Sequence, residues 1–499
     1  MSAGLASAAR RQQAATGKGG LAAVLRAGIS ERTRLWSLGL LIVAAFVFGG
    51  GSRGDIASLI VLRPLSFVLL ALGLIGLGWR DWARLGMPGW IALGVAALAI
   101  MQLVPLPPAI WSALPGRELP AEIAAMMGWS EQWRPLSLSP SRTLNAGFAL
   151  GVPLASLALL AGLRGAQHRA IVWLMLGMGA LSSIVGLAQL IGPPGGPLYF
   201  YRITNPDVAV GLFANRNHHA IFLASVIPLL GYCGFSSWHD SASSRRAVTM
   251  VGIVGTIAFL VPLVLATGSR AGALLALGLS VAMIVLVGLQ IRWRGSVVWH
   301  RAAVPQWLRK LIAPLMLAGI AGIAGLTHFA ARSLSFERLL DPNMDAGLRA
   351  ELLPHLIAMA RDHFPAGTGL GAFRQAWEVV EPRELLRPQY LNQAHNDVLQ
   401  LVIEGGAAGL ALMIVVAIWF VRSGARAWSG FATAAKGGAA PGMALFAWLA
   451  LAALLAGSVF DYPLRTPSLM AFAALLACLT QISLKPAQDP APAERKPSR

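Results

Sequence analysis

The chain has 499 residues, of which 56% are hydrophobic and 12% charged, and its mean hydropathy is +0.64. Soluble domains carry roughly 25% charged residues, so the composition excludes both a set of soluble domains and a disordered chain. Apolar runs of about 20 residues, long enough to cross roughly 30 Å of hydrocarbon, recur along the whole sequence. The sequence therefore predicts a polytopic membrane protein with an all-α fold.

The formal net charge of +19 would favour nucleic-acid binding in a soluble protein, but here its distribution across the bilayer matters more. Both cysteines, Cys233 and Cys478, lie in apolar runs, which excludes a disulfide framework and a cysteine-built metal site. The sequence has no Walker loop, dinucleotide fingerprint, HExxH or GxSxG motif. We therefore expect no nucleic acid, no metal ion and no other cofactor.

Twelve segments read as membrane spans. They are 36–50, 56–78, 88–106, 144–163, 170–192, 215–235, 247–266, 270–291, 310–329, 398–421, 440–459 and 464–484. Lys and Arg gather on the cytoplasmic side of membrane proteins, so they indicate the orientation. With the N-terminus in the cytoplasm, the cytoplasmic segments hold 24 basic and 5 acidic residues, and the rest of the chain holds 16 of each. The whole excess charge thus lies on one side, which predicts two cytoplasmic termini.

The spans divide the chain into tails, a membrane domain and outer loops. Residues 1–35 are predicted to be a cytoplasmic tail, and the first span is predicted to be a retained signal anchor. Residues 36–484 form the transmembrane domain, and 485–499 form a disordered cytoplasmic tail. The long outer loops are about 107–143, 193–214 and 330–397.

The third outer loop is the largest, and a loop of this length usually carries function. It shows helical periodicity around LRAELLPHLIAMARDHF and continues into GTGLGAF. No strand is expected before the GTGLGAF segment, so it is interpreted as a turn and not as a nucleotide-binding loop.

Ionisable residues at membrane depth are costly, so each is a candidate functional residue. The motif FANRNHHA opens the sixth span and contains Arg216, Asn217, His218 and His219. A helix N-terminus beside a guanidinium group makes an anion site. The alternatives are an interfacial cap with a snorkelling Arg216 and a packing role for His219.

The segment ATGSRAGALLALG forms a tight outer turn between the seventh and eighth spans. Arg270 lies in the first turn of the eighth span, among small residues that allow a large ligand to approach. Alone it could be an interfacial anchor. Two arginine sites that face the same side favour an anionic substrate group, because guanidinium is permanently charged and binds phosphate bidentately.

The large loop supplies Arg349 and ends in NQAHNDVLQLVIEGGAAGL. His395 precedes the tenth span by a few residues and can titrate near neutral pH, which suits a general base. Asn396 and Asp397 are placed to orient it, and Glu404 lies about two turns deeper in the span. The alternative role for His395 is a structural cap.

The succession of FANRNHHA, TGSRAGAL, Arg349 before RDHFPAGTGLGAF, and AHNDVLQLVIEGGAAGL resembles the O-antigen ligase and O-antigen polymerase superfamily. The resemblance covers about residues 205–412, and the LPLPPAIW loop is also similar. The last motif is the most specific, because family members place a His-Asn pair before a span with Leu-Gln, Glu and Gly-x-x-Gly in this order. Gly406 and Gly409 supply the glycines here.

This resemblance implies a metal-independent, membrane-embedded glycosyltransferase of the GT-C type in the bacterial inner membrane. Such an enzyme moves a glycan from undecaprenyl pyrophosphate to an acceptor hydroxyl on the periplasmic face. By motif position, Arg270 and Arg349 match the family's pyrophosphate-contacting arginines and His395 matches its catalytic histidine. The residues expected to bind substrate are Arg216, Asn217, His218 and Asn396.

The residues agree with this implied chemistry. A lipid-linked donor brings its own leaving group, so the enzyme must offset a pyrophosphate charge with arginine and deprotonate an alcohol. We expect an O-antigen ligase whose acceptor is lipid A-core, with the lipid bilayer and a chain-length regulator as further partners. A polymerase of O-antigen or exopolysaccharide is the first alternative, and a protein-glycosylating oligosaccharyltransferase is a relative.

An alternative from another class is a twelve-span transporter or flippase. Transporters usually show repeated halves and binding sites at the midplane. Spans one to six and seven to twelve differ in their loop lengths, and the polar residues concentrate in one outer loop. These features favour the enzyme.

Overall fold

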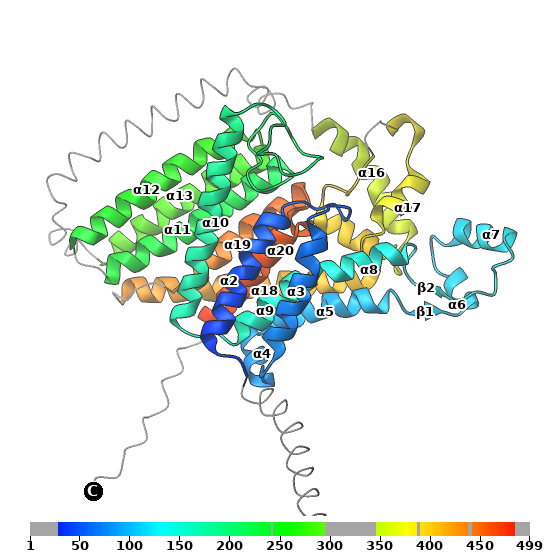
Figure 1. The fold of residues 1–499 in the computed structure, drawn as a ribbon, viewed down its shortest axis with the longest axis horizontal. Coiled ribbons are helices and arrows are strands. Elements are labelled where there is room, and N and C mark those ends of the chain that lie inside the picture. The colour runs from blue at the N-terminus through cyan, green and yellow to red at the C-terminus, as the bar shows by residue number, and fades with distance from the viewer. Residues whose placement is uncertain (1–27, 241–242, 295–345, 387–389, 438–441, 485–499) are drawn as a thin grey trace, which may run out of the picture.

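The computed structural model describes residues 28–240, 243–294, 346–386, 390–437 and 442–484 (Figure 1). The described part is mostly α-helical, as predicted. The expected ninth span, the C-terminal tail and most of the N-terminal tail lie outside these residues.

The helices of the membrane domain follow one another with short connections (Figure 1). They are α2 (Glu31–Phe48), α3 (Leu59–Leu74), α4 (Trp79–Leu85), α5 (Met87–Met101), α8 (Pro140–Ala149), α9 (Gly151–Ala161), α10 (Ala166–Ile191), α11 (Arg216–Asp240), α12 (Ser243–Ala266), α13 (Arg270–Arg294), α18 (Asp397–Lys436), α19 (Ala444–Phe460) and α20 (Pro467–Ser483). The connections and outer segments add β1 (Pro105–Leu106), α6 (Pro108–Ser112), α7 (Glu118–Met126), β2 (Arg134–Pro135), α16 (Ala346–Asp362), α17 (Phe373–Val380) and the 3-10 turns η2 (Arg383–Leu385) and η3 (Pro463–Arg465).

Eleven of the twelve expected spans fall in the described residues, and each coincides with a helix or, for the fourth, with the pair α8 and α9. Among the described residues, five helical segments are long and apolar enough to cross a membrane, namely α8 with α9, α10, α11, α13 and α18. Shorter apolar helices include α3, α5, α19 and α20. The chain therefore has the helices of a membrane protein, while the total of twelve spans stays a prediction.

Helix α11 lies at the centre of the bundle, where 89% of its apolar stretch is buried, against 28% for α18. It packs against α10, α12, α13 and α19, whereas α2, α3, α9 and α20 form a neighbouring group (Figure 1). A cluster of phenylalanines joins the two groups, with Phe46 of α2, Phe222 of α11 and Phe472 of α20 in mutual ring contact. This core holds the helix ends in fixed positions.

Helix α18 is interrupted at Gly406, where φ is 56° and ψ is −141°. The glycine loop, with the sequence PAGTGLG, passes beside this interruption. The amides of Thr368 and Gly369 donate to the carbonyls of Ile403 and Glu404, at 2.9 and 3.0 Å. The predicted turn is confirmed, and its backbone satisfies carbonyls that an interrupted helix leaves without intrahelical partners.

One end of the bundle, which we call the outer end after the predicted orientation, holds the first residues of six helices. These are α3, α8, α11, α13, α18 and α20. The segment between α2 and α3 connects them: the Gly50 carbonyl accepts from the Ala214 amide just before α11, and the Gly49 carbonyl accepts from the Ser468 amide of α20. Outside this end, α16 and α17 form a small apolar core with α18 around Leu356. The expected helical periodicity of the large loop is thus confirmed.

The loop that carries α6 and α7 is held by a buried arginine. The Arg117 guanidinium donates to the carbonyls of Leu136 and Gly367 at 2.7 and 2.8 Å. Burial lowers the pKa of Arg117 to about 10, and nearby Glu118 opposes the shift. These contacts attach the loop with α6 and α7 to the glycine loop.

Candidate functional site

His395 lies in the segment that enters α18, and in the described chain it is the one non-glycine residue with a positive φ, 51°. That left-handed backbone costs an L residue about 1–3 kcal/mol and is concentrated at functional sites. The next residue, Asn396, caps α18 because its Oδ1 accepts from the Leu399 amide at 2.9 Å. The cap fixes the start of the helix and, with it, the place of His395.

Asp461, which follows α19, lies beside His395. Its Oδ1 is 3.3 Å from His395 Nδ1, a close electrostatic contact whose angle is not that of a hydrogen bond. Asn217 Nδ2 donates to Asp461 Oδ2 at 2.6 Å, and the Tyr462 amide donates to Oδ1 at 3.0 Å. Asp461 is 1% exposed, whereas the His395 side chain is 31% exposed. A substrate can therefore reach the histidine, while the protein holds the carboxylate.

The Tyr462 ring lies between two histidines. Its centroid is 4.9 Å from that of His395 and 5.1 Å from that of His218, both in edge-on geometry. His218 is fully buried, and its Nδ1 is 2.9 Å from Thr466 Oγ1. A ring without exposed surface cannot take a proton from a bound substrate. His218 is therefore part of the inner wall of the site.

The starts of α11 and α13 lie side by side and carry two of the expected arginines. Arg216 begins α11 and is buried, and Arg270 begins α13 and is half-buried. Ser269 Oγ accepts from the Gly272 amide at 3.2 Å and caps α13. A Cβ placed on Gly272 would lie 2.3 Å from Ala220 Cβ, so only glycine allows α13 to approach α11 this closely.

Arg349 lies in the first turn of α16, and its side chain falls outside the described part of the chain. The structure thus brings together His395, Asn217 and His218 through Asp461 and Tyr462. His219 packs elsewhere, with its Nδ1 3.0 Å from the Ala209 carbonyl.

Arg465 forms a second polar group on the other side of the α18 start. Its Nη1 lies 2.7 Å from Glu404 Oε2 and its Nε lies 3.3 Å from Asp397 Oδ1. Gln400 Nε2 also donates to Glu404 Oε1 at 3.0 Å. Asp397 and Glu404 therefore hold Arg465, and neither orients His395.

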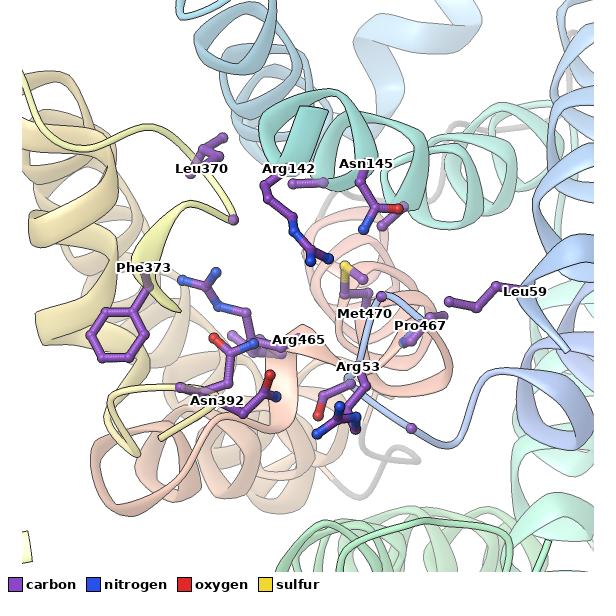
Figure 2. Close-up of a pocket in the computed structure, with 18 of the residues that line it drawn as sticks. Arg53, Leu59, Arg142, Asn145, Leu370, Phe373, Asn392, Arg465, Pro467 and Met470 are labelled. Carbon is purple, nitrogen blue, oxygen red and sulfur yellow. The ribbon is translucent and has the colours of Figure 1, made fainter. Parts of the chain in front are cut away.

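A cavity of about 400 Å³ opens next to this group (Figure 2). Its wall includes Gln393 and Asp397, which lie two residues before and after His395 in sequence. Arg142 of α8 extends toward the middle of the cavity, and Arg465 and Arg53 lie across from it. A molecule bound here would therefore lie beside the site.

Sequence reasoning missed Asp461, Tyr462 and Arg465. All three belong to DYPLRTP, the short connection between the last two spans. An acid and a base between two apolar runs are the type of membrane-depth residue that marks a functional site. The same rule that selected Arg270 would have selected Asp461 and Arg465.

Residues 255–414 match the family model described as O-Antigen ligase. The match extends from α12 into α18 and includes Arg270, Arg349 and His395, whereas Asn217 and Asp461 lie outside it. No curated protein matches the chain. The resemblance drawn from the motifs is confirmed for the segment 255–414, which is similar to the O-antigen ligase family.

Proposed function

We propose that this protein is an O-antigen ligase of the bacterial inner membrane, which transfers a glycan from undecaprenyl pyrophosphate to a hydroxyl of lipid A-core at the periplasmic face. The observation that carries the proposal is the exposed His395 beside the buried Asp461, at the end of the bundle where Arg216 and Arg270 begin their helices. The O-antigen ligase segment supports the same chemistry.

His395 acts as the general base. As the acceptor oxygen attacks the anomeric carbon, its proton passes to His395 Nε2, because Nδ1 faces Asp461. Asp461 keeps the ring in place and stabilises the imidazolium that forms, which is the division of labour in nucleophile–base–carboxylate sets. Asn217 holds the other oxygen of the carboxylate and so fixes its direction.

The leaving group takes the electron pair of the bond between the anomeric carbon and the phosphate oxygen. Arg270 and Arg349 bind the developing charge on the undecaprenyl pyrophosphate, since guanidinium groups bind phosphate oxygens in pairs. Arg216 adds positive charge at the start of α11. On this proposal the arginines offset the charge and no metal ion is needed, so a chelator should leave the rate unchanged.

The test uses full-length protein in lipid nanodiscs with a lipid-linked glycan donor and lipid A-core. His395→Ala should lower turnover by about 10²–10⁴-fold, the usual contribution of a general base, with donor affinity little changed. Asp461→Asn keeps the shape and removes the charge, so its loss of turnover should be smaller. His355→Ala, which changes an exposed histidine of α16, is the matched control.

Turnover within about threefold of wild type in His395→Ala, together with collapsed donor affinity, would make His395 a binding residue. The acceptor is tested separately by deleting the gene and separating the cellular glycans on a gel. Loss of the ladder on lipid A-core with accumulated lipid-linked polymer supports the ligase, whereas a band of a single repeat unit would indicate a polymerase.

A further inference from the structure

The cavity beside the site is lined by regular faces of outer helix ends. Leu59, Leu62 and Arg63 line it from α3, at the three- and four-residue spacing that places side chains on one helix face. Arg142 and Asn145 line it from α8 in the same way. Two helices therefore supply this part of the wall.

Stacked side chains form another part of the cavity wall. The guanidinium groups of Arg374 and Arg53 lie over the Tyr390 ring, 3.7 and 5.1 Å from its centroid. Each arginine also has a carboxylate partner: Glu378 lies 2.7 Å from Arg374, and Asp55 lies 3.1 Å from Arg53. These two arginines are thus already neutralised.

Arg63 and Arg142 also line the cavity, and they differ from its other arginines. In the part of the chain that the structure describes, the guanidinium groups of Arg63 and Arg142 have neither a carboxylate nor a hydrogen-bond acceptor, and the Nε of Arg63 is buried. Leaving a buried charged donor unmatched is costly. Figure 2 shows Arg142 extended into the open volume rather than toward a protein partner. An anion in the cavity would match both groups.

The same two helices carry exposed apolar side chains next to the cavity residues. Phe67 lies one turn after Arg63, Phe148 lies on α8 after Asn145, and the two rings are in edge-on contact at 6.0 Å. Both rings are exposed, at 40% and 44%. A volume of about 400 Å³ accommodates a phosphorylated sugar, while attached acyl chains would remain in the bilayer beside these rings.

We propose that this cavity is the acceptor subsite and that it binds a phosphate-bearing sugar of lipid A-core through Arg63 and Arg142. The assignment rests on the proposed function. In a direct displacement the acceptor approaches opposite the leaving group, and the cavity lies on the α3, α8 and α20 side, away from the arginine-bearing starts of α11 and α13 (Figure 1). Gln393 and Asp397 in its wall are each two residues from His395 in the chain.

The test is binding to full-length protein in nanodiscs, with three probes: phosphorylated lipid A-core, the same glycolipid after phosphatase treatment, and undecaprenyl pyrophosphate. Wild type should bind the phosphorylated glycolipid at least about tenfold more tightly than the treated form, in line with two charged phosphate contacts. The double variant Arg63→Gln with Arg142→Gln should lose this preference and keep its affinity for undecaprenyl pyrophosphate. Arg383→Gln, an exposed arginine of η2, should behave as wild type.

Equal binding of both glycolipid forms by wild type would overturn the proposal. So would a double variant that loses only undecaprenyl pyrophosphate, because the cavity would then hold the donor. If the double variant fails to melt cooperatively, Arg142→Gln alone carries the same test, since its side chain is partly exposed. Phosphate-dependent binding without glycan transfer would refute the proposed activity and leave the subsite supported. Glycan transfer without a preference for phosphate would support the activity and refute the subsite.

Discussion

The two parts of α18 on either side of Gly406 differ although both come from one apolar run. In the first part Gln400 and Glu404 are fully buried and hydrogen-bonded. In the second part Ile418 and Val421 are 49% and 67% exposed, as expected of a surface that faces lipid. Hydropathy alone does not separate them, and the difference comes from the break in the backbone.

The break makes the first part a support for the site. It frees the Glu404 carbonyl, which accepts from Gln102 Nε2 at 2.8 Å and from the Gly369 amide at 3.0 Å. The same residue holds Arg465 with its side chain. The short helix before Gly406 is thus tied to α5, the glycine loop and the last connection, and it presents His395 from a fixed position. The second part instead packs along α19 and buries Trp419 and Phe431.

The largest expected effect concerns the side of the membrane on which each part of α18 lies. Phosphatase fused after residue 375, before the first part, should be active in the periplasm, and phosphatase fused after residue 430, near the end of the second part, should be inactive. The segregation of the +19 charge excess motivates this expectation. Enzyme assays on intact cells measure it. An inactive fusion at 375 would place the site in the cytoplasm and end the proposed function.

The next effect concerns the buried charges of the first part. Glu404→Ala removes one of the two carboxylates that pair with Arg465. Removing one partner of a buried ion pair typically costs about 3–5 kcal/mol of folding stability. We expect a large drop in the melting temperature of the purified protein or loss of folded protein in the membrane. Glu378→Ala breaks the partly exposed pair with Arg374 and should cost no more than about 1 kcal/mol. Similar losses in both variants would contradict a special role for the first part.

These features were visible in the sequence to different degrees. The helix starts at Arg216 and Arg270, and the place of His395 before α18, were predicted because polar motifs interrupt apolar runs there. Asp461 pairs with His395 across more than sixty residues of chain, and no local spacing encodes such a contact. The hydrophobic pattern predicted one span over 398–421, whereas the helix extends from Asp397 to Lys436 with an interruption.

The interruption of α18 has a signal in the sequence, namely its glycines, which the sequence analysis assigns to a different role. Gly406 and Gly409 are assigned there to the family motif, but glycine inside a helical pattern also indicates a close backbone approach. In the structure a Cβ on Gly406 would lie 2.1 Å from the Pro365 carbonyl oxygen. Which glycine breaks the helix depends on the glycine loop that packs there, and this tertiary contact cannot be deduced from the pattern.

The smallest expected effect is seen by comparing two glycines of α18, Gly406 at the interruption and Gly430 in the second part. Gly406→Ala forces a side chain into a backbone conformation that only glycine adopts readily and drives its Cβ into the glycine loop. The backbone strain alone should cost about 1–3 kcal/mol. Gly430→Ala, in the second part, meets open space and should stabilise the helix by about 0.5–1 kcal/mol, since alanine loses less conformational entropy than glycine. Melting temperatures of the two purified variants should therefore move in opposite directions. If Gly406→Ala melts as wild type does, the interruption is not fixed by glycine, and the first part of α18 would need no loop to hold it.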